Sequence, residues 1–519
     1  MATHQSRRRW GIAALSACAL LLGTASAATA ANDVLDPSSD LFVDFHSSTV
    51  EAAAGLTGQA QADALLLGSF PGSSWLTQGT PTEVQAEAHE IVTAAADQGQ
   101  VPTLVAYNVP FRDCAQYSAG GATSQAEYEA WIDGLAAGIG DQEAVVILEP
   151  DGLGIIPWYT TIDGGLEWCQ PVEADQATAA AERFAMLNHA VDVLTALPNT
   201  AVYLDGTHTG WLSVGDVTDR LIKAGVTRAD GFFLNASNYQ ETEKLQKYGT
   251  WVSQCIQLDQ ESWFERQWCG SQYYPATPTD FSTWGLTDAA YDQAYADTGL
   301  TRDPAAMAHF VIDTSRNGQG PWTAPAGVYP SPEEWCNPLD RGLGLRPTTD
   351  TGDPLIDAYL WIKVPGESDG QCLRGTAGPQ DPARGMVDPP AGGWFVEQAA
   401  ELIAFAVPPV TRPTCEVSYT VHGTWPRGFN TQVWLKNTGT TTIDGWQLAF
   451  AFGGGQTVDH MWSASYEQVG QVVTASNLTW NATIRPGART TFGFIGRTDG
   501  GPNPEPLLFL RNGAACTVA

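Results

Sequence analysis

Short apolar runs alternate with amphipathic, alanine-rich stretches from about residue 40 to residue 405. Between several runs, apolar residues recur at helical spacing, as in the segments 82–98, 125–139, 175–197 and 214–224. Alternation of strands and helices predicts a mostly parallel sheet. Seven strands favour a closed or nearly closed barrel, with a doubly wound open sheet as the alternative. The expected strands are 73–76, 102–107, 145–149, 202–205, 231–235, 309–313 and 359–363.

Two long stretches interrupt this alternation, at residues 240–301 and 370–393, and both read as loop-rich. Loops of this length in a compact domain usually serve as functional walls or lids. The segment 407–414 is rich in Pro and Thr and reads as a short linker. After it, short alternating runs are separated by Gly, Asn and Thr without helical period, which predicts an all-β sandwich over 415–519.

Polar residues follow several of the expected strands directly. The run 145–148 continues into Glu149, Pro150 and Asp151, and Asp113 follows the preceding strand. The carboxyl ends of parallel strands meet at one rim, where barrel folds build active sites. Paired carboxylates without metal ligands indicate acid/base hydrolysis, of which glycoside cleavage is the leading case. The structural alternative is that Asp151 merely caps the next helix.

The composition narrows the class of partner. The chain has 57 acidic and 25 basic residues and a net charge of −32, which argues against nucleic acid or an anionic membrane as partner. Nineteen tryptophans offer faces on which sugar rings stack, although larger aromatic cores are the alternative. There is no CxxC pair or HExxH motif, and the eight histidines do not cluster, so we expect neither a metal nor another cofactor.

Residues 1–30 read as an export signal, with a basic Arg7–Arg9, a short apolar core and a small-residue cleavage site at 28–30. The apolar run is too short for a membrane span. The paired arginines leave twin-arginine export open. Residues 15–18 match a lipoprotein cleavage box, but Cys18 lies inside the apolar run, which disfavours lipidation. Eight further cysteines, an even number in an exported protein, predict disulfides.

Five motifs in the first part of the chain resemble those of glycoside hydrolase family 6, the cellulases. Residues 105–121 read V-x-Y-x-x-P-x-R-D-C-A-x-x-S-A-x-G and residues 148–151 read L-E-P-D. The others are Y-L-D-G-T-H-T-G-W at 203–211, N-A-S-N-Y at 235–239 and L-W-I-K-V-P-G-E-S-D-G at 360–370. Gly152 departs from the second signature, which usually has Ser, Ala or Leu there.

This resemblance implies a distorted seven-stranded (β/α) barrel over residues 31–406 that hydrolyses β-1,4-glucan with inversion. It implies that Asp151 is the general acid. Asp113 would raise the pKa of that acid and accept a proton from the attacking water, and Asp369 is the other candidate for the base. Tyr107 would press on the sugar ring at the cleavage point. The remaining substrate-binding residues would be Ser118, Asp205, His208, Asn238, Lys363 and Glu367 for hydroxyls, and Trp75, Trp211 and Trp335 for stacking.

The segment 415–519 resembles a family 2 carbohydrate-binding module, on the motif W-P-R-G-F at 425–429 and the Trp, Asn and Gly pattern after it. The match implies a cellulose-binding strip of Trp425, Trp462 and Trp480, with Trp446 in the core. Both resemblances imply the disulfides Cys114–Cys169, Cys336–Cys372 and Cys415–Cys516, which leave Cys255 to pair with Cys269.

We therefore expect a secreted, extracellular and monomeric endo-β-1,4-glucanase that acts on cellulose and related β-1,4-glucans. A cellobiohydrolase of the same family is the alternative, because the loop after Asp113 is short, as in open-cleft members, whereas the loop after Asp369 is long, as in tunnel-forming members. A non-catalytic cellulose-binding protein is a more distant alternative.

Overall fold

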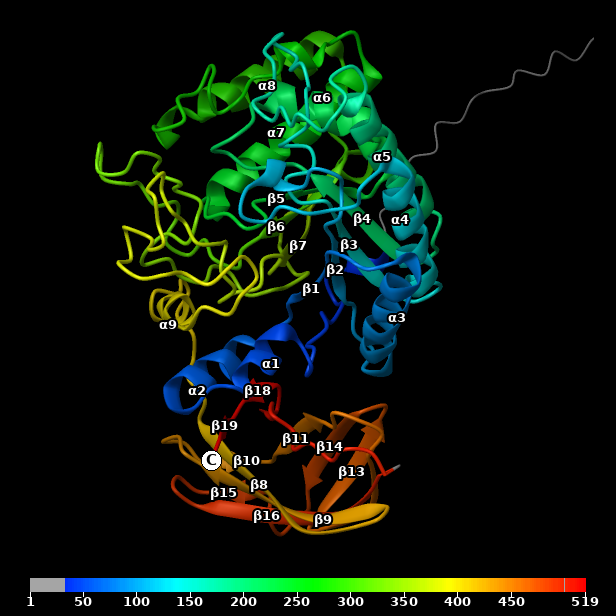
Figure 1. Cartoon of the computed structure of the whole chain (residues 1–519), viewed down its shortest axis with the longest axis vertical. Coiled ribbons are helices and arrows are strands. Elements are labelled where there is room, and N and C mark those ends of the chain that lie inside the picture. Colours follow the sequence, from blue (N-terminus) through cyan, green and yellow to red (C-terminus); the bar gives the residue numbers. More distant parts are fainter. Residues whose placement is uncertain (1–32, 499) are drawn as a thin grey trace, which may run out of the picture.

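The computed structural model describes residues 33–498 and 500–519 (Figure 1). The predicted export signal at 1–30, including Cys18, lies outside the described residues. An α/β domain is followed by a smaller β-rich module, and helices α1 and α2 lie between the two (Figure 1).

Seven parallel strands form one sheet in strict chain order from β1 to β7, which confirms the distorted barrel. A doubly wound sheet is excluded, because its strand order reverses at a switch point. Within the described residues, no backbone pairing joins β7 to β1. Instead, the Ser73 Oγ donates to the Trp361 carbonyl at 3.0 Å and the Trp75 Nε1 to the Ile362 carbonyl at 2.8 Å. The strands are β1 Ser73–Leu76, β2 Thr103–Ala106, β3 Ala144–Leu148, β4 Thr200–Asp205, β5 Gly231–Leu234, β6 His309–Asp313 and β7 Ile356–Leu360.

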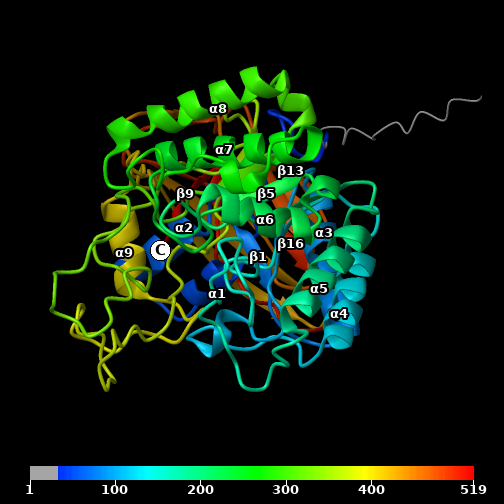
Figure 2. The ribbon, with the colours of Figure 1, turned by 90° about the horizontal axis from the view of Figure 1, so that it is seen from above.

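Two apolar layers hold this sheet. Inside the barrel, alternate strand residues such as Val105, Ile147 and Phe233 form one buried cluster, while their neighbours pack outward against the helices. Seen from above, α3 to α8 cover two sides of the domain, and irregular segments occupy another (Figure 2). The helices are α1 Ser48–Ala53, α2 Gly58–Leu67, α3 Pro81–Asp97, α4 Gln125–Ile139, α5 Ala179–Leu194, α6 Val214–Ala224, α7 Thr242–Glu261, α8 Gly285–Thr298 and α9 Val396–Ala404.

The prediction of a loop-rich stretch at 240–301 is wrong, because α7 and α8 occupy most of it. Buried Leu245, Tyr248, Val252 and Ile256 recur along α7 at helical spacing, but the polar residues between them hide this stripe. The other stretch, 370–393, is irregular as expected, with only an isolated bridge between Asp381 and Met386. The strand β7 ends at Leu360, so the predicted extension to residue 363 is also wrong.

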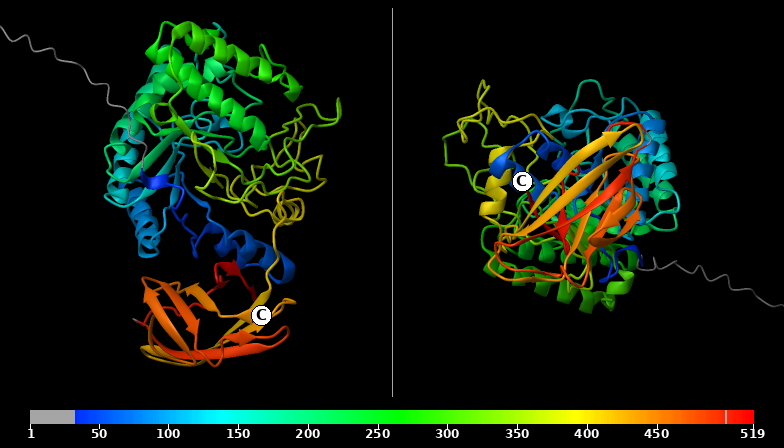
Figure 3. Two further views of the ribbon diagram at one scale, coloured as in Figure 1. Left: turned by 180° about the vertical axis from the view of Figure 1, so that it is seen from behind. Right: turned by 90° about the horizontal axis from the view of Figure 1, so that it is seen from below.

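The module is a sandwich of two five-stranded sheets, in the orders β12-β16-β9-β8-β19 and β13-β14-β11-β17-β18. Its core contains Trp446, 1% exposed and stacked on Phe492 with ring centroids 5.7 Å apart. The first sheet lies on the side away from the α/β domain, as the view from below shows (Figure 3). The strands are β8 Cys415–Trp425, β9 Gly428–Asn437, β10 Ile443–Asp444, β11 Gln447–Ala451, β12 Thr457–Trp462, β13 Ala464–Val469, β14 Val472–Asn477, β15 Thr483–Ile484, β16 Arg489–Arg497, β17 Leu510–Arg511, β18 Ala514–Ala515 and β19 Thr517–Val518.

Candidate active site

A cleft of about 410 Å³ opens at the carboxyl ends of the barrel strands, and most of the predicted site residues line it. All three candidate catalytic carboxylates are present. The predicted residues that line the cleft are Trp75, Tyr107, Asp113, Ser118, Asp151, His208, Trp211, Asn238, Trp335, Lys363 and Asp369.

Two predicted residues, Asp205 and Glu367, do not line this cleft. The buried Asp205 accepts hydrogen bonds from the backbone amides of Leu153, Gly154 and Thr207 at 2.9–3.2 Å, so both of its oxygens are engaged behind the cleft. Glu367 accepts a hydrogen bond from the Ser48 Oγ at 2.7 Å and faces a neighbouring cavity. The structure therefore gives neither residue the predicted contact with substrate hydroxyls in the cleft.

Asp151 follows β3 through a tight turn in which Glu149 and Asp151 both have positive φ, at 55° and 63°. A Cβ added to Gly152 would lie 2.6 Å from the Glu149 carbonyl oxygen, so this turn has no room for a side chain at position 152. Burial raises the pKa of Asp151 well above its usual value, and the charges of Asp205, Asp113 and Asp369 raise it further. The surroundings of Asp151 thus favour its protonated form over its charged form.

The pKa of Asp113 is also raised, but groups around it favour its charged form. Burial raises its pKa to about 6, although the hydrogen bond from the Ser118 amide, at 2.8 Å, and the charge of Arg112 oppose this shift. Among the described residues, only its Oδ2 accepts a hydrogen bond, so its Oδ1 is available to a water molecule in the cleft. Asp113 can therefore accept a proton at neutral pH.

Asp369 is held much more tightly. The Arg316 Nη1 lies 3.0 Å from both of its oxygens, and the Arg316 side chain is fully buried. Its Oδ2 also accepts from the Tyr239 hydroxyl at 3.2 Å and from the Asn337 amide at 3.0 Å. Asp369 is therefore bound by three donors from the protein, whereas Asp113 accepts one hydrogen bond among the described residues.

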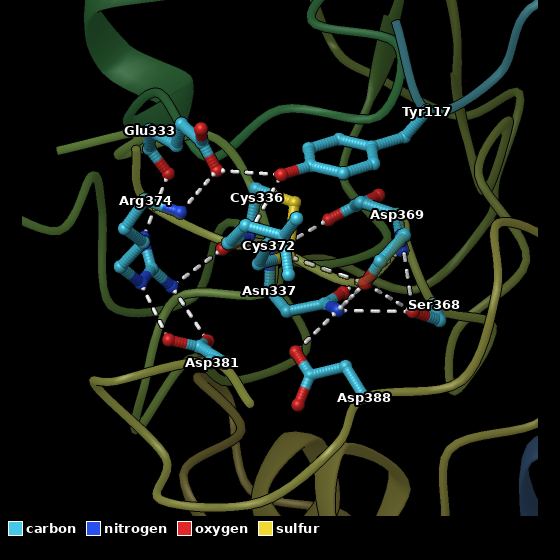
Figure 4. Close-up of a disulfide and its surroundings, with 12 residues drawn as sticks. Tyr117, Glu333, Cys336, Asn337, Ser368, Asp369, Cys372, Arg374, Asp381 and Asp388 are labelled. Carbon is cyan, nitrogen blue, oxygen red and sulfur yellow. Dashed lines mark hydrogen bonds and ion pairs between the residues drawn. A yellow bond between two sulfur atoms is a disulfide. The ribbon is translucent and has the colours of Figure 1, made fainter. Parts of the chain in front are cut away.

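A buried network supports Asp369 from behind (Figure 4). Asn337 exchanges backbone and side-chain hydrogen bonds with Asp369, and the disulfide Cys336–Cys372 joins the segments on either side. Arg374, in the same loop as Cys372, forms a fully buried ion pair with Asp381. The segment after Asp369 therefore has a fixed shape although it lacks helices and strands.

Tyr117 connects this network to the Asp113 loop (Figure 4). Its hydroxyl donates to Glu333 at 3.1 Å and accepts from the Leu373 amide at 2.7 Å. Its ring lies 6.0 Å from that of Trp335. The two segments that carry Asp113 and Asp369 are thus joined through one side chain.

The other predicted contacts surround the carboxylates. The indole of Trp75 meets the ring of Tyr107 edge-on at 5.4 Å, and the Lys363 Nζ lies 5.8 Å from the Trp75 ring. Burial lowers the pKa of Lys363, and it lowers the pKa of His208 to about 4. The His208 Nδ1 accepts from the Gly210 amide at 3.1 Å, so the neutral ring carries its proton on Nε2, ready to donate.

Sequence reasoning missed further lining residues. The indoles of Trp168 and Trp322 line the cleft, and Trp168 is 51% exposed. The position of Trp168 next to Cys169, which is bonded to the Asp113 loop, could have indicated it. The remaining missed polar residues are Gln116, Ser237, Tyr239, Gln240 and Glu334.

Four disulfides are present in the described residues, and their pairs are those expected: Cys114–Cys169, Cys255–Cys269, Cys336–Cys372 and Cys415–Cys516. In the part of the chain that the structure describes, the single cluster with metal-ligand spacing comprises Cys372, Asp381 and Asp388. Its sulfur is in a disulfide and Asp381 is paired with Arg374, which makes it a poor metal site. No helix among the described residues has the length and apolar character needed to cross a membrane.

In the module, Trp425, Trp462 and Trp480 are 48%, 42% and 69% exposed, whereas Trp446 is buried. Trp425 and Trp462 end strands β8 and β12 of the outward-facing sheet. Large exposed indoles are unusual on a soluble protein and indicate a binding surface.

Comparisons with known proteins agree with this division. A family model described as glycosyl hydrolases family 6 matches residues 38–406, and one described as a cellulose binding domain matches residues 415–516.

Three relatives illustrate the range of similar proteins. Endoglucanase A of Thermobispora bispora is 32% identical over 466 residues, which is 84% of this chain and 83% of that protein. A probable 1,4-beta-D-glucan cellobiohydrolase C of Neosartorya fischeri is 29% identical over 392 residues, which is 70% of this chain and 76% of the relative. The solved structure of the endoglucanase Cel6 from Mycobacterium tuberculosis, in complex with methyl-cellobiosyl-4-deoxy-4-thio-beta-D-cellobioside, is 32% identical with a TM-score of 0.52 and covers 72% of this chain and 98% of its own.

Proposed function

Because the chain belongs to glycosyl hydrolases family 6 and carries a cellulose binding domain, we propose that it is a secreted endo-β-1,4-glucanase. It hydrolyses internal bonds of cellulose with inversion of the anomeric configuration. The observation that carries this proposal is the pair of carboxyls that line the cleft, Asp151, whose pKa is raised by burial and by neighbouring carboxylates, and Asp113, which has an oxygen available to water.

In the proposed reaction, Asp151 donates its proton to the leaving glycosidic oxygen. Water attacks the anomeric carbon from the opposite face and loses a proton to Asp113, directly or through a second water. This single displacement inverts the anomeric configuration. The tight binding of Asp369 by Arg316 supports Asp113 over Asp369 as the base. We propose that Asp369 instead keeps negative charge near Asp151 and thereby helps to keep the acid protonated.

The remaining lining residues position the sugar rings. Tyr107, braced by Trp75 and by the guanidinium of Arg112 at 4.6 Å, presses on the ring at the cleavage point. Ser118, His208, Asn238 and Lys363 bind hydroxyls. The stacking platforms are Trp75, Trp211 and Trp335, and we add Trp168 and Trp322 to them.

The arrangement of the two cleft walls supports cleavage of internal bonds of the glucan chain. The two walls meet where Tyr117 contacts the segment 370–374. If these residues covered the cleft, they would line it, but none of them is among its described lining residues. Their contact braces the walls from behind and leaves the cleft open to the side. The long segment at 370–393 is the feature that favours the alternative, a cellobiohydrolase, and one relative has that name.

The binding domain and the disulfides support extracellular action on an insoluble polymer. The strip of Trp425, Trp462 and Trp480 binds the flat face of cellulose, and four disulfides suit an oxidising environment. We propose a monomer that acts on cellulose and related β-1,4-glucans. A non-catalytic role is disfavoured because Asp113, Asp151, Lys363 and Asp369 all line the cleft.

Two measurements on carboxymethyl cellulose and cello-oligosaccharides test this function. Proton NMR of the first products should reveal the α-anomer, and a β-anomer would rule out single displacement. Viscosity should fall faster than reducing ends appear, with Asp151→Asn as the inactive control. Cellobiose as nearly the sole early product, with little loss of viscosity, would support the cellobiohydrolase instead.

A further inference from the structure

The binding domain is docked on the catalytic domain, although the linker between them looks separable. One buried apolar cluster contains residues of both domains, with Leu65 and Leu66 of α2 on one side and Leu508, Leu510 and Ala515 on the other. Fully burying a side chain of this kind contributes about 1.5–3 kcal/mol. The cluster therefore holds the two domains in one orientation (Figures 1 and 3).

Polar contacts secure the same orientation. Arg412 in the linker forms an ion pair with Asp63 of α2, and Asp63 is buried. The Arg346 Nη2 donates to the Pro408 carbonyl at 2.7 Å, and the His46 Nε2 lies 3.1 Å from the Phe452 carbonyl. The linker is bonded along its length to the surface beneath it, which limits its freedom as a tether.

Between the docked domains lies a cavity of about 700 Å³. Its catalytic-domain wall comes from α1, β1 and α3, and its outer wall is the turn between β13 and β14 of the binding domain. At that turn Gly470 has φ 55°, and a Cβ on it would collide with the Asp97 carboxylate at the end of α3. The turn therefore lies directly against the end of α3 and closes the cavity there. The volume is within the roughly 300–1,000 Å³ of small-molecule sites.

This cavity adjoins the catalytic cleft. Trp75 lines both spaces, and its ring is fixed by the edge contact with Tyr107 and by the bond from its Nε1 to the Ile362 carbonyl. Glu367, which the cleft does not use, lines the cavity and is held by Ser48. Trp75 is therefore a wall that the cleft and the cavity share.

The lining suits a neutral, hydroxyl-rich ligand. Carboxylates, serine hydroxyls, amides and the imidazoles of His46 and His89 face the cavity, and none of its described lining residues is Lys or Arg. An anion would be repelled by this wall. A metal ion is also a poor fit, because no three His, Cys, Asp or Glu side chains among the described lining residues gather at metal-ligand spacing. Representative polar residues are Asp44, Glu51, Ser74, Glu90, Gln98 and Gln471.

We propose that this cavity is a further binding site for the glucan chain, with the binding domain as its outer wall. The proposal rests on the proposed function, since its ligand is the part of the substrate that extends beyond Trp75. The binding domain then contacts cellulose on two sides: the tryptophan strip faces the crystal, and the turn at Gly470 and Gln471 faces the chain that is being cut.

The test compares substrates of increasing length in the full chain. Thr93 is exposed on α3 and faces the cavity, so Thr93→Trp fills the cavity without disturbing buried residues. The matched control is Ala86→Trp, on the same helix, exposed and outside the cavity lining. The kcat/KM values of cellotriose through cellohexaose are measured for each protein.

We expect kcat/KM of the unmodified protein to rise with the length of the oligosaccharide. In Thr93→Trp, kcat/KM should stop rising for the longest oligosaccharides. We expect a drop of about five-fold on the longest substrate, the fold-change for one lost sugar contact, and no change on the shortest. Ala86→Trp should follow the unmodified chain at every length. Equal values for Thr93→Trp and the unmodified chain on all substrates would overturn the proposal.

A second variant guards against misfolding of the first. A flexible Gly/Ser segment inserted between Pro409 and Val410, combined with Leu510→Asp, which places a charge in the apolar cluster that docks the domains, lets the binding domain leave its docked position. This variant should reduce the same length-dependent rise. An unchanged rise in this variant would overturn the proposal. Loss of all hydrolysis by the unmodified chain would instead contradict the proposed function, so the two failures are distinguishable.

Discussion

The cleft and the tryptophan strip are both assigned to the same polymer, yet they are built by opposite physical means. The cleft places carboxyls where water is scarce, and burial shifts their pKa values apart from those of exposed acids. The strip leaves three apolar indoles exposed and contains no titratable group of its own. Hydrolysis thus depends on buried carboxyls, whose burial is energetically unfavourable, whereas adsorption to cellulose depends on exposed apolar surface.

The largest expected effect separates these two regions completely. Asp151→Asn removes the proton that the leaving oxygen needs, so hydrolysis of cellulose should fall by on the order of 10²–10⁴-fold. Binding to crystalline cellulose should not change, because the strip is untouched. Reducing-sugar release and a depletion isotherm measure the two quantities. Retention of full activity would show that Asp151 is not the acid.

The converse change should act on binding alone. Each indole stack contributes roughly 1 kcal/mol, so replacing Trp425, Trp462 and Trp480 by Ala should weaken adsorption by on the order of 100-fold. Activity on soluble carboxymethyl cellulose should remain. The control is Tyr466→Ala, because Tyr466 is exposed in the same domain. Trp446→Ala is not a suitable control, because Trp446 is in the core. Normal adsorption of the triple variant would refute the strip.

Without any mutation, a change of pH should alter hydrolysis in the cleft and leave adsorption through the strip unchanged. Asp113 must be deprotonated to accept a proton, and its pKa is about 6, so kcat/KM should fall about tenfold per pH unit below pH 6. Above pH 6 the base is ready, and activity lasts until Asp151 loses its proton at higher pH. Adsorption through the three indoles should stay constant over the same range. A flat acidic limb in kcat/KM would contradict the role of Asp113.

The smallest expected effect concerns the joint between the two walls of the cleft. Tyr117→Phe removes the hydroxyl that contacts Glu333 and the Leu373 amide, which should destabilise the fold by about 1–2 kcal/mol. Because Tyr117 positions the Asp113 loop, we expect a few-fold lower kcat and a shifted acidic limb. Tyr274→Phe, at a residue 80% exposed, is the matched control. A lower melting temperature with an unchanged pH profile would mean that Tyr117 has a structural role only.

The sequence predicted the barrel well because β2, β3, β4 and β5 are fully buried and mostly apolar runs, a signal that needs no tertiary information. The segments 73–76 and 309–313 coincide with β1 and β6, whereas β7 ends before Trp361, where the carbonyls of Trp361 and Ile362 accept hydrogen bonds from side chains of β1. The helix α7 was missed because its buried stripe is diluted by polar residues.

Side-chain direction at a strand end was harder to predict. Asp205 is the last residue of β4, and a local motif could not tell whether its carboxylate enters the cleft or turns back to the amides of the neighbouring turn. The position of Glu367 outside the cleft could not be predicted for the same reason, since its partner Ser48 lies 319 positions away in the chain. The docking of the two domains could not be predicted either, because its contacts, such as Arg412 with Asp63, join surfaces whose pairing no local pattern records.

The open seam between β1 and β7 has a consequence for how such an enzyme can change over generations. Backbone hydrogen bonds fix the spacing of all the neighbouring strand pairs from β1–β2 to β6–β7, and no substitution other than proline removes them. At the seam, the spacing depends on the Ser73 hydroxyl and the Trp75 indole, which are encoded side chains. The width of the barrel beside Trp75 is therefore a heritable trait that selection can adjust one codon at a time, while the rest of the sheet stays unchanged.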